Sequence, residues 1–291
     1  MSSTAVRDRV RTLASSTNQR LMTRLVQSRR VPRVAFQHYF IETAGLHSRV
    51  MLQNFYSTFW PHLGAQATAR IDVFTPDGRR VGRYEERLAP FGSLFLEAKD
   101  LLTRVGAELD EGSLTIDLEP PPGVLDELAS FPLAEPWTLR ISTPFWMAYY
   151  DGDENYMYVH SIDRQVGEFY GVPAPVGWFL SRRFGVPGGS WRAGRLLDTG
   201  GLKELQIVAI NHGAVQRTST VGLFDAVTDD PVWTAKHTFA PHALQRFAVP
   251  PETLSERSLQ VRVGVDPLAT INGKPYVLMR YGDGPLSLHH G

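Results

Sequence analysis

Histidines that follow two similar strand-and-turn segments are the residues with the clearest potential for chemistry. One segment, PFWMAYYDGDENYMYVHS, runs from a Pro-aromatic start through bulky residues and a Gly/Asp turn to His160. The other, PYVLMRYGDGPLSLHHG, follows the same course to His289 and His290. Because both segments place histidine at the end of a predicted strand, imidazoles from two distant parts of the chain could meet at one site.

A divalent metal such as zinc or iron is the cofactor that these imidazoles would suit, with a carboxylate such as that of Asp151 as a further ligand. No His-Glu-x-x-His motif occurs in the chain. In addition, the adjacent His289 and His290 would point to opposite faces of a strand. Exposed or hydrogen-bonded histidines explain the same pattern. The principal interpretation is therefore that the protein holds no cofactor, and a metal site at His160, His289, His290 and Asp151 is the alternative.

A segment rich in Gly, Pro, Trp, Phe and Arg, residues 166–203, offers a second kind of chemistry. Flat aromatic faces beside guanidinium groups can stack on a ring while binding a carboxylate or phosphate. Alternatively, the tryptophans close one end of a core and the arginines are solvated. We take this segment as the predicted surface for a small polar or anionic ligand or a protein partner. The residues predicted to bind are Trp178, Arg182, Arg183, Trp191 and Arg192.

Composition and missing motifs narrow the functional classes. Lys plus Arg and Asp plus Glu balance at 30 each, whereas a nucleic-acid-binding domain is normally basic, so we expect no nucleic-acid partner. The chain has no cysteine, which excludes disulfides, thiolate ligands and a cysteine nucleophile and fits a reducing, cytoplasmic location. Neither a phosphate-binding loop nor a nucleophile-elbow motif is present.

Most of the chain beyond residue 45 has the period of β-strands. Short runs rich in β-branched and aromatic residues, separated by turn signals, include HSRVMLQNFYS, ARIDVFTPDGRRVGRYEERL, SLFLEA and SLTIDLEP. Strands spaced in this way without helical patterns between them indicate an all-β sandwich or barrel.

The second half repeats the order of these runs. LQIVAIN ends at Asn211 as RVMLQN ends at Asn54, and SLQVRV corresponds to SLTIDL. An internal duplication is the simplest explanation. The sequence therefore predicts two tandem β-sandwiches, residues 36–165 and 204–291, packed through a pseudo-twofold relation, with residues 166–203 crossing between them.

The first 35 residues differ from the rest of the chain. Residues 1–33 contain eight arginines against the single acid Asp8, and apolar residues recur at helical spacing. We predict a basic amphipathic helix over residues 1–35. It packs on the body of the protein, docks on an anionic membrane surface or a partner, or acts as a transit peptide.

One repeat resembles a known family. The features are Asn54 after a strand, the turn Asp77-Gly78, Val81-Gly82, Leu88-Ala89-Pro90, and Asp100-Leu101 after an apolar strand. This order resembles the sensory rhodopsin transducer family, which implies a single β-sandwich domain that acts as a cytoplasmic interaction protein. The likeness covers about 60 residues of the first repeat, is looser in the second, and implies no site residues.

These observations predict a non-enzymatic tandem β-sandwich protein that binds a ligand or partner. The alternative is an enzyme, metal-dependent or not, with a His/Asp site between the repeats. Open sandwiches have exposed strand edges that self-association can cover, so we also expect a homo-oligomer.

Overall fold

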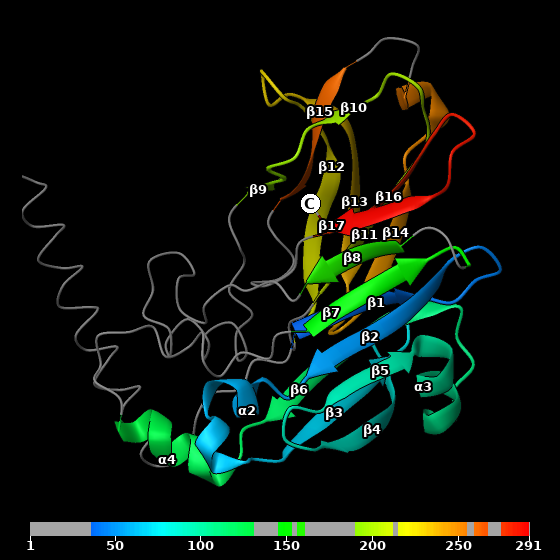
Figure 1. Cartoon of the computed structure of the whole chain (residues 1–291). Coiled ribbons are helices and arrows are strands. Elements are labelled where there is room, and N and C mark those ends of the chain that lie inside the picture. Colours follow the sequence, from blue (N-terminus) through cyan, green and yellow to red (C-terminus); the bar gives the residue numbers. More distant parts are fainter. Residues whose placement is uncertain are drawn as a thin grey trace, which may run out of the picture.

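In the residues that it describes, the computed structural model consists mostly of antiparallel strands, with a few short helices (Figure 1). This confirms the predicted all-β class. The predicted N-terminal helix over 1–35 lies outside the described residues, as do Trp178, Arg182 and Arg183. The structure describes residues 36–130, 145–152, 156–160, 190–211, 215–254, 259–266 and 275–290.

The described residues of the N-terminal half form two four-stranded sheets. Sheet I has the order β1-β6-β3-β4, and sheet II has the order β5-β2-β7-β8. The elements are β1 (Phe36–Ile41), β2 (His47–Gln53), α2 (Phe55–Phe59), η1 (Pro61–Leu63), β3 (Ala67–Phe74), β4 (Arg80–Leu88), β5 (Ser93–Glu97), α3 (Ala98–Val105), β6 (Glu111–Glu119), α4 (Pro122–Ser130), β7 (Phe145–Tyr150) and β8 (Tyr156–His160).

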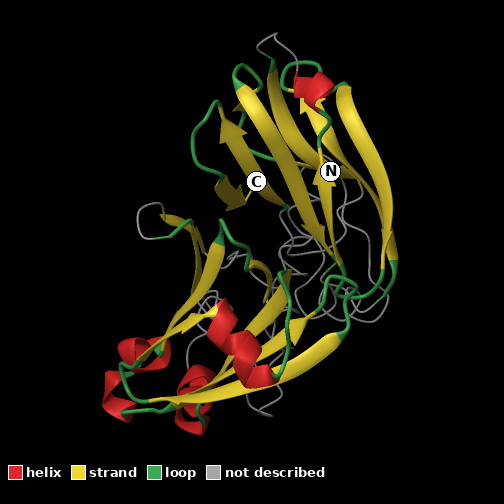
Figure 2. Cartoon of the chain, turned by 90° about the vertical axis from the view of Figure 1, so that its right-hand side faces the viewer, coloured by secondary structure: helices red, strands yellow, loops and turns green. Residues whose placement is uncertain are grey.

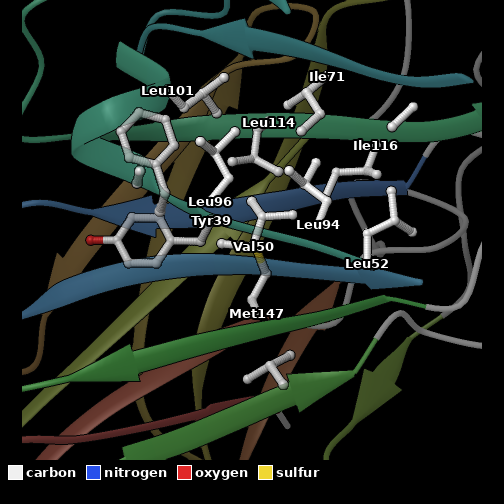
Figure 3. Close-up of a cluster of buried hydrophobic side chains, with 14 of the residues drawn as sticks. Tyr39, Val50, Leu52, Ile71, Leu94, Leu96, Leu101, Leu114, Ile116 and Met147 are labelled. Carbon is white, nitrogen blue, oxygen red and sulfur yellow. The ribbon is translucent and has the colours of Figure 1, made fainter. Parts of the chain in front are cut away.

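Alternating apolar residues of sheets I and II form one buried cluster (Figure 3). Ile71 and Leu114 come from sheet I, and Val50, Leu96 and Met147 come from sheet II. All five are almost completely buried. The period of two along each strand places these side chains on the same face, and their burial removes apolar surface from water.

The described residues of the C-terminal half also form two sheets. Sheet III has the order β10-β15-β12-β13, with β9 also paired to β15, and sheet IV has the order β14-β11-β16-β17. The elements are β9 (Trp191–Arg192), β10 (Leu197–Asp198), β11 (Leu202–Ile210), β12 (Arg217–Asp225), β13 (Pro231–Phe239), β14 (Leu244–Ala248), η4 (Pro251–Leu254), β15 (Gln260–Asp266), β16 (Tyr276–Tyr281) and β17 (Ser287–His290). Strands β9 and β10 fall within the predicted crossover 166–203 and pair with β15, so this sheet begins earlier than predicted.

The two halves share strand order and local detail. The order β6-β3-β4 corresponds to β15-β12-β13, and β5-β2-β7-β8 corresponds to β14-β11-β16-β17. The buried Asn54 amide donates a hydrogen bond to the Ala89 carbonyl at 3.0 Å, and the buried Asn211 amide donates to Ala240 at 2.9 Å. We therefore use these correspondences to compare positions in the two halves.

Sheet IV is buried on both faces. Along β11, Ile207 and Ala209 belong to a core that is confined to the C-terminal half, whereas Val208 and Ile210 belong to the core of the N-terminal half. Along β16, Tyr276 likewise joins the N-terminal core. Figure 2 shows the halves as two β-rich lobes, and this sheet connects them.

Three buried tyrosines carry the contact between the halves. The Tyr149 hydroxyl donates to the carbonyl oxygen of Tyr39 at 2.6 Å. The Tyr276 hydroxyl is 2.7 Å from Nδ1 of the buried His38, and its ring centroid is 5.8 Å from that of Tyr39. Burial raises the pKa of Tyr276 well above its ordinary value. Because these hydroxyls stay protonated at all ordinary pH values, they serve as fixed hydrogen-bonding groups in the junction.

An ion pair covers the rim of this tyrosine cluster. Nη2 of Arg246, in β14, donates to the Tyr39 hydroxyl at 2.7 Å, and the same guanidinium is paired with the Glu111 carboxylate. The Tyr39 hydroxyl donates to that carboxylate at 2.7 Å. All three groups are thus satisfied across the junction, which lowers the cost of burying them.

A hairpin tip of the N-terminal half inserts against a turn of the C-terminal half. The Leu244 N–H donates to the Pro76 carbonyl at 2.8 Å. The His242 ring stacks on Phe74 with the centroids 4.8 Å apart. Gly78 has a φ of +88°, and a Cβ there would lie 2.1 Å from the Pro241 carbonyl oxygen, so the approach requires glycine.

This contact is head-to-tail, so the predicted pseudo-twofold packing is wrong. A twofold would also bring the β12–β13 tip, which carries Val227, onto the turn that carries Phe91. Instead Val227 is 91% exposed and Phe91 is 57% exposed. Apart from the corresponding edge strands β8 and β17, which contact each other, the two halves use different surfaces at the junction.

Acid is expected to weaken this junction through His242. Its ring is half-buried, and burial lowers its pKa below the ordinary value of 6.5, although Asp72 partly opposes the shift. The unfolded chain therefore binds a proton more readily, so the free energy of unfolding decreases as the pH falls below about 6.5. Urea unfolding at pH 7 and pH 5 measures this loss.

The matched variant is His242→Asn, because asparagine tolerates the left-handed backbone that His242 adopts at a φ of +60°. We expect a smaller pH dependence of the unfolding free energy in this variant. An unchanged slope would exclude His242 as a source of the acid sensitivity.

Among the described residues, no helix has the length and apolar character needed to cross a bilayer.

Candidate functional site

The described part of the predicted crossover site is engaged in contacts within the fold. Arg192, in β9, binds the carboxylates of Asp229 and Asp266 at 2.8 and 2.9 Å. Its guanidinium also lies 3.5 Å from the centroid of the Phe224 ring. Trp191 is half-buried and packs against the C-terminal core. These contacts attach β9 to β15. Arg192 is therefore not a solvated arginine, and ligand binding by Trp191 and Arg192 stays a prediction.

Whether Trp178, Arg182 and Arg183 bind a ligand stays a prediction, because these three residues lie outside the described part of the chain.

The strands that carry the candidate metal ligands lie side by side. The Leu288 N–H of β17 points at the sulfur of Met157 in β8, so the two strand ends do approach one another. In the described ranges, no three His, Cys, Asp or Glu side chains are grouped closely enough to hold a metal ion. Asp151 and the backbone of His160 are described, but the His160 side chain is not.

His289 is held as a neutral imidazole. Arg195 Nη1 is 3.0 Å from its Nδ1, and a guanidinium can only donate, so Nδ1 accepts. Burial lowers the pKa of His289 to about 4, with further contributions from the charges of Arg195 and His290. Nδ1 is therefore already used by a cation. A metal site including His289 stays a prediction and would have to use Nε2.

The outward side of sheet II carries large apolar side chains that the core does not use. Phe95 is 65% exposed, Tyr158 55%, Trp146 48% and Tyr156 40%. Met51 of β2 lies opposite both Phe95 and Trp146, so these side chains form a continuous row across three strands. We call the surface made by Met51, Phe95, Trp146, Tyr150, Tyr156 and Tyr158 the aromatic face.

Local interactions hold the rings of the aromatic face in place. The Tyr150 and Tyr156 rings stack at 5.3 Å, and the Arg49 guanidinium lies 5.2 Å from the Tyr150 centroid. The Tyr150 hydroxyl donates to Glu97 at 2.6 Å, and Glu97 is also paired with Arg49. Burial raises the pKa of Tyr150, and the hydrogen bond to Glu97 raises it further. The Tyr150 and Tyr156 rings are thus ordered before any partner arrives, which reduces the entropic cost of binding.

Sequence reasoning missed the aromatic face, although a signal for it existed. In SLFLEA and YMYVH, bulky apolar residues occupy both parities of the strand. In a strand with one solvated face, apolar and polar residues should alternate along the sequence. Apolar residues at both parities therefore indicate a sheet that is covered, or used, on both sides.

The counterpart of this surface in sheet IV is a buried interface. Trp146 lies opposite Met51 in sheet II, as Tyr276 lies opposite Val208 in sheet IV. Tyr276 is only 1% exposed because it packs on the N-terminal half, whereas Trp146 is 48% exposed. The side of sheet IV that corresponds to the aromatic face is thus already packed against another part of the molecule.

Comparison with known proteins adds little to this geometry. No family model matches the chain, and no curated protein matches it. A solved structure described as a beta-glucuronidase from glycoside hydrolase family 2 is similar at 10% identity with a TM-score of 0.17. The match covers 87% of this chain and spans 23% of that enzyme. A similarity of this size supports no inference about fold or activity.

Proposed function

We propose that this chain is a non-enzymatic binding protein that recognises a protein partner through the aromatic face. The observation that carries the proposal is the exposure of Phe95, Trp146, Tyr156 and Tyr158 on one side of one sheet. A contiguous apolar surface rimmed by polar groups is typical of protein interfaces, and Trp, Tyr and Phe are enriched in them.

The surroundings of these rings favour a protein over a small ligand. The aromatic face lies on strands that form an open sheet surface, and Phe91 and Phe59 add further exposed rings in the adjoining turn and helix. Small molecules normally bind in concave pockets that enclose most of their surface. The proposal is supported by the counterpart in sheet IV, which packs on the N-terminal half.

The proposal includes an internal duplication, giving two tandem β-sandwich units. It is supported by the shared strand orders and by the equivalent bonds of Asn54 and Asn211. A further match is the left-handed backbone at Phe91 and His242, with φ values of 59° and 60° at corresponding turn positions. The proposal also places the protein in the cytoplasm, as the absence of cysteine suggests.

Site-specific photo-crosslinking tests the proposed function. A benzophenone side chain at position 95 or 158 of the full chain is irradiated in extract of the source cells. We expect discrete adducts with protein, because both positions lie on the aromatic face. Position 87 is the matched control, since Arg87 is exposed on β4, away from this face. Absence of protein adducts at 95 and 158, or equal yields at 87, would refute the proposal.

A further inference from the structure

We infer that the partner covering the aromatic face is a second copy of this chain, docked head-to-tail in the way that the two halves dock within one chain. This inference rests on the proposed function of the aromatic face and names its partner. It starts from the asymmetry of the internal junction. A head-to-tail contact between two similar units uses one surface of each and leaves the opposite surface of each unit without a counterpart.

In the N-terminal half, the surface that corresponds to the docking surface of sheet IV is the exposed aromatic face. Tyr158 lies opposite Ala148 in sheet II, as Leu288 lies opposite Leu278 in sheet IV. Leu278 and Leu288 are buried against the N-terminal half, with exposures of 0% and 2%. Every strand of sheet IV contributes to this docking surface, and each contributing position has its counterpart in sheet II. The docking residues of sheet IV are Val208, Ile210, Leu244, Arg246, Tyr276, Leu278 and Leu288.

The opposite surface of the C-terminal half also carries exposed hydrophobic side chains. In the described ranges, the large hydrophobic residues of this half that are exposed are Leu196, Val227 and Tyr281. Val227 lies in the β12–β13 tip, which corresponds to the tip that carries Pro76 in the N-terminal half. Leu196 lies between β9 and β10, which pair with β15 as β1 pairs with β6. Leu196 and Val227 thus fall where a head-to-tail contact requires exposed hydrophobic residues.

The turn that would receive this tip already has the required conformation. Within the chain, the tip at Pro76 packs on the turn that contains His242. The corresponding turn of the N-terminal half contains Phe91, which has the same left-handed backbone and a 57% exposed ring. Phe91 is therefore placed to receive the Val227 tip of another copy.

Two details of the contact between copies would differ from the internal one. The β12–β13 tip, residues 225–230, contains no glycine, so its backbone cannot repeat the close approach that Gly78 allows within the chain. Within the chain the His242 ring stacks on the Phe74 ring, whereas the counterpart Phe224 is covered by the Arg192 guanidinium. An incoming Phe91 ring would meet this guanidinium instead of a ring. Aromatic faces bind such cations favourably, so the substitution preserves an attractive contact.

Complementation between two blocked variants tests the head-to-tail contact. Trp146→Arg places a charge on the aromatic face, and the double variant Leu196→Ser, Val227→Asp changes the opposite surface. All three positions are exposed, so both variants should fold as the wild type does. By sedimentation velocity, we expect the mass of the wild-type chain to rise with concentration. Each variant alone should self-associate more than about tenfold more weakly.

An equimolar mixture of the two variants provides the decisive result. Each variant retains one intact surface, so a head-to-tail contact predicts a heterodimer that grows no further. A face-to-face contact between two aromatic faces predicts instead that the Leu196→Ser, Val227→Asp variant self-associates normally and that the mixture forms no heterodimer. That outcome overturns the inference, as does a wild-type chain that stays monomeric at all concentrations. Arg87→Ala is the control and should associate like the wild type.

Failure of this inference can be separated from failure of the proposed function. Mass spectrometry of the adducts formed from position 158 identifies what covers the aromatic face. Adducts with residues 190–290 of a second copy support the head-to-tail contact. Adducts with a different protein, or with residues 1–35 of the same chain, overturn it. The first of these two outcomes leaves the proposed function intact, whereas adducts confined to residues 1–35 refute both.

Discussion

Replacing Tyr276 by Ala is expected to lower the free energy of unfolding by about 3–5 kcal/mol, as for other large buried aromatic residues. Its ring is 1% exposed and packs between Tyr39 and Tyr149, and its hydroxyl is hydrogen-bonded to His38. The substitution leaves a cavity at the junction and removes the partner of a buried imidazole nitrogen. Urea unfolding followed by far-ultraviolet circular dichroism and by tryptophan fluorescence measures the loss.

The matched control is Trp146→Ala, at the corresponding position of sheet II. Because Trp146 is half-exposed, its removal should cost about 1 kcal/mol or less. Equal losses for the two variants would contradict the difference in burial that underlies both proposals.

The cooperativity of unfolding tests the junction itself. Sheet IV belongs to both cores, so the two halves should unfold in one transition that both probes report alike. In Tyr276→Ala the N-terminal half loses part of its cover, and its strands should be destabilised although the mutated residue belongs to the C-terminal half. The wild type could instead unfold in two separate transitions, of which the substitution shifts only the one that belongs to the C-terminal half. That result would show that the halves are independent.

Replacing Asn211 by Ala is expected to cost about 2–4 kcal/mol, and Asn54→Ala should cost a similar amount. Asn211 is fully buried, and its amide donates to the carbonyls of Val215 and Ala240 at 2.8 and 2.9 Å. Alanine leaves these carbonyl oxygens without donors in a place that water reaches poorly. The same denaturant titration gives both values.

Gln53→Ala is the control for the asparagine pair, because Gln53 is the exposed neighbour of Asn54. Its removal should change the unfolding free energy by about 0.5 kcal/mol or less. Should Asn54→Ala and Asn211→Ala differ strongly, the two amides would not have equivalent structural roles, and the proposed duplication would lose one of its supports.

The strand pattern was readable because it depends on local alternation. The run from Ala67 to Leu88 alternates around the turn at Pro76-Asp77-Gly78, and the structure has a hairpin there. The likeness between the strands that end at Asn54 and Asn211 was also visible, since both asparagines bind the turns that follow. Period and turn chemistry are properties of neighbouring residues, so one chain is enough to reveal them.

The relation between the halves was not readable, and the pseudo-twofold expectation was wrong. Two similar units can pack in several ways. The arrangement that forms is the one in which the contacting surfaces match best in shape and hydrogen bonding. Here the choice depends on Tyr39, Arg246 and Tyr276, which meet only after folding although they are far apart in sequence. No local sequence pattern predicts a contact between residues so far apart in the chain.

The candidate site was likewise predictable from the sequence only in part. The types of the side chains at Phe95, Trp146 and Tyr158 are written in the sequence, but their exposure is not, because an apolar strand residue is normally a core residue. Conversely, the sequence suggested that Arg192 could bind an anionic ligand. In the folded chain its guanidinium is paired with two carboxylates and lies on the Phe224 ring.

The sequence by itself determined the all-β class, the positions of most strands and turns, and the absence of cysteine chemistry. Only the tertiary structure decided that sheet IV is covered on both faces while the rings of the corresponding aromatic face of sheet II are partly exposed. The physical reason is that alternation is a short-range property of the chain. Burial, by contrast, depends on which distant surface arrives to exclude the water.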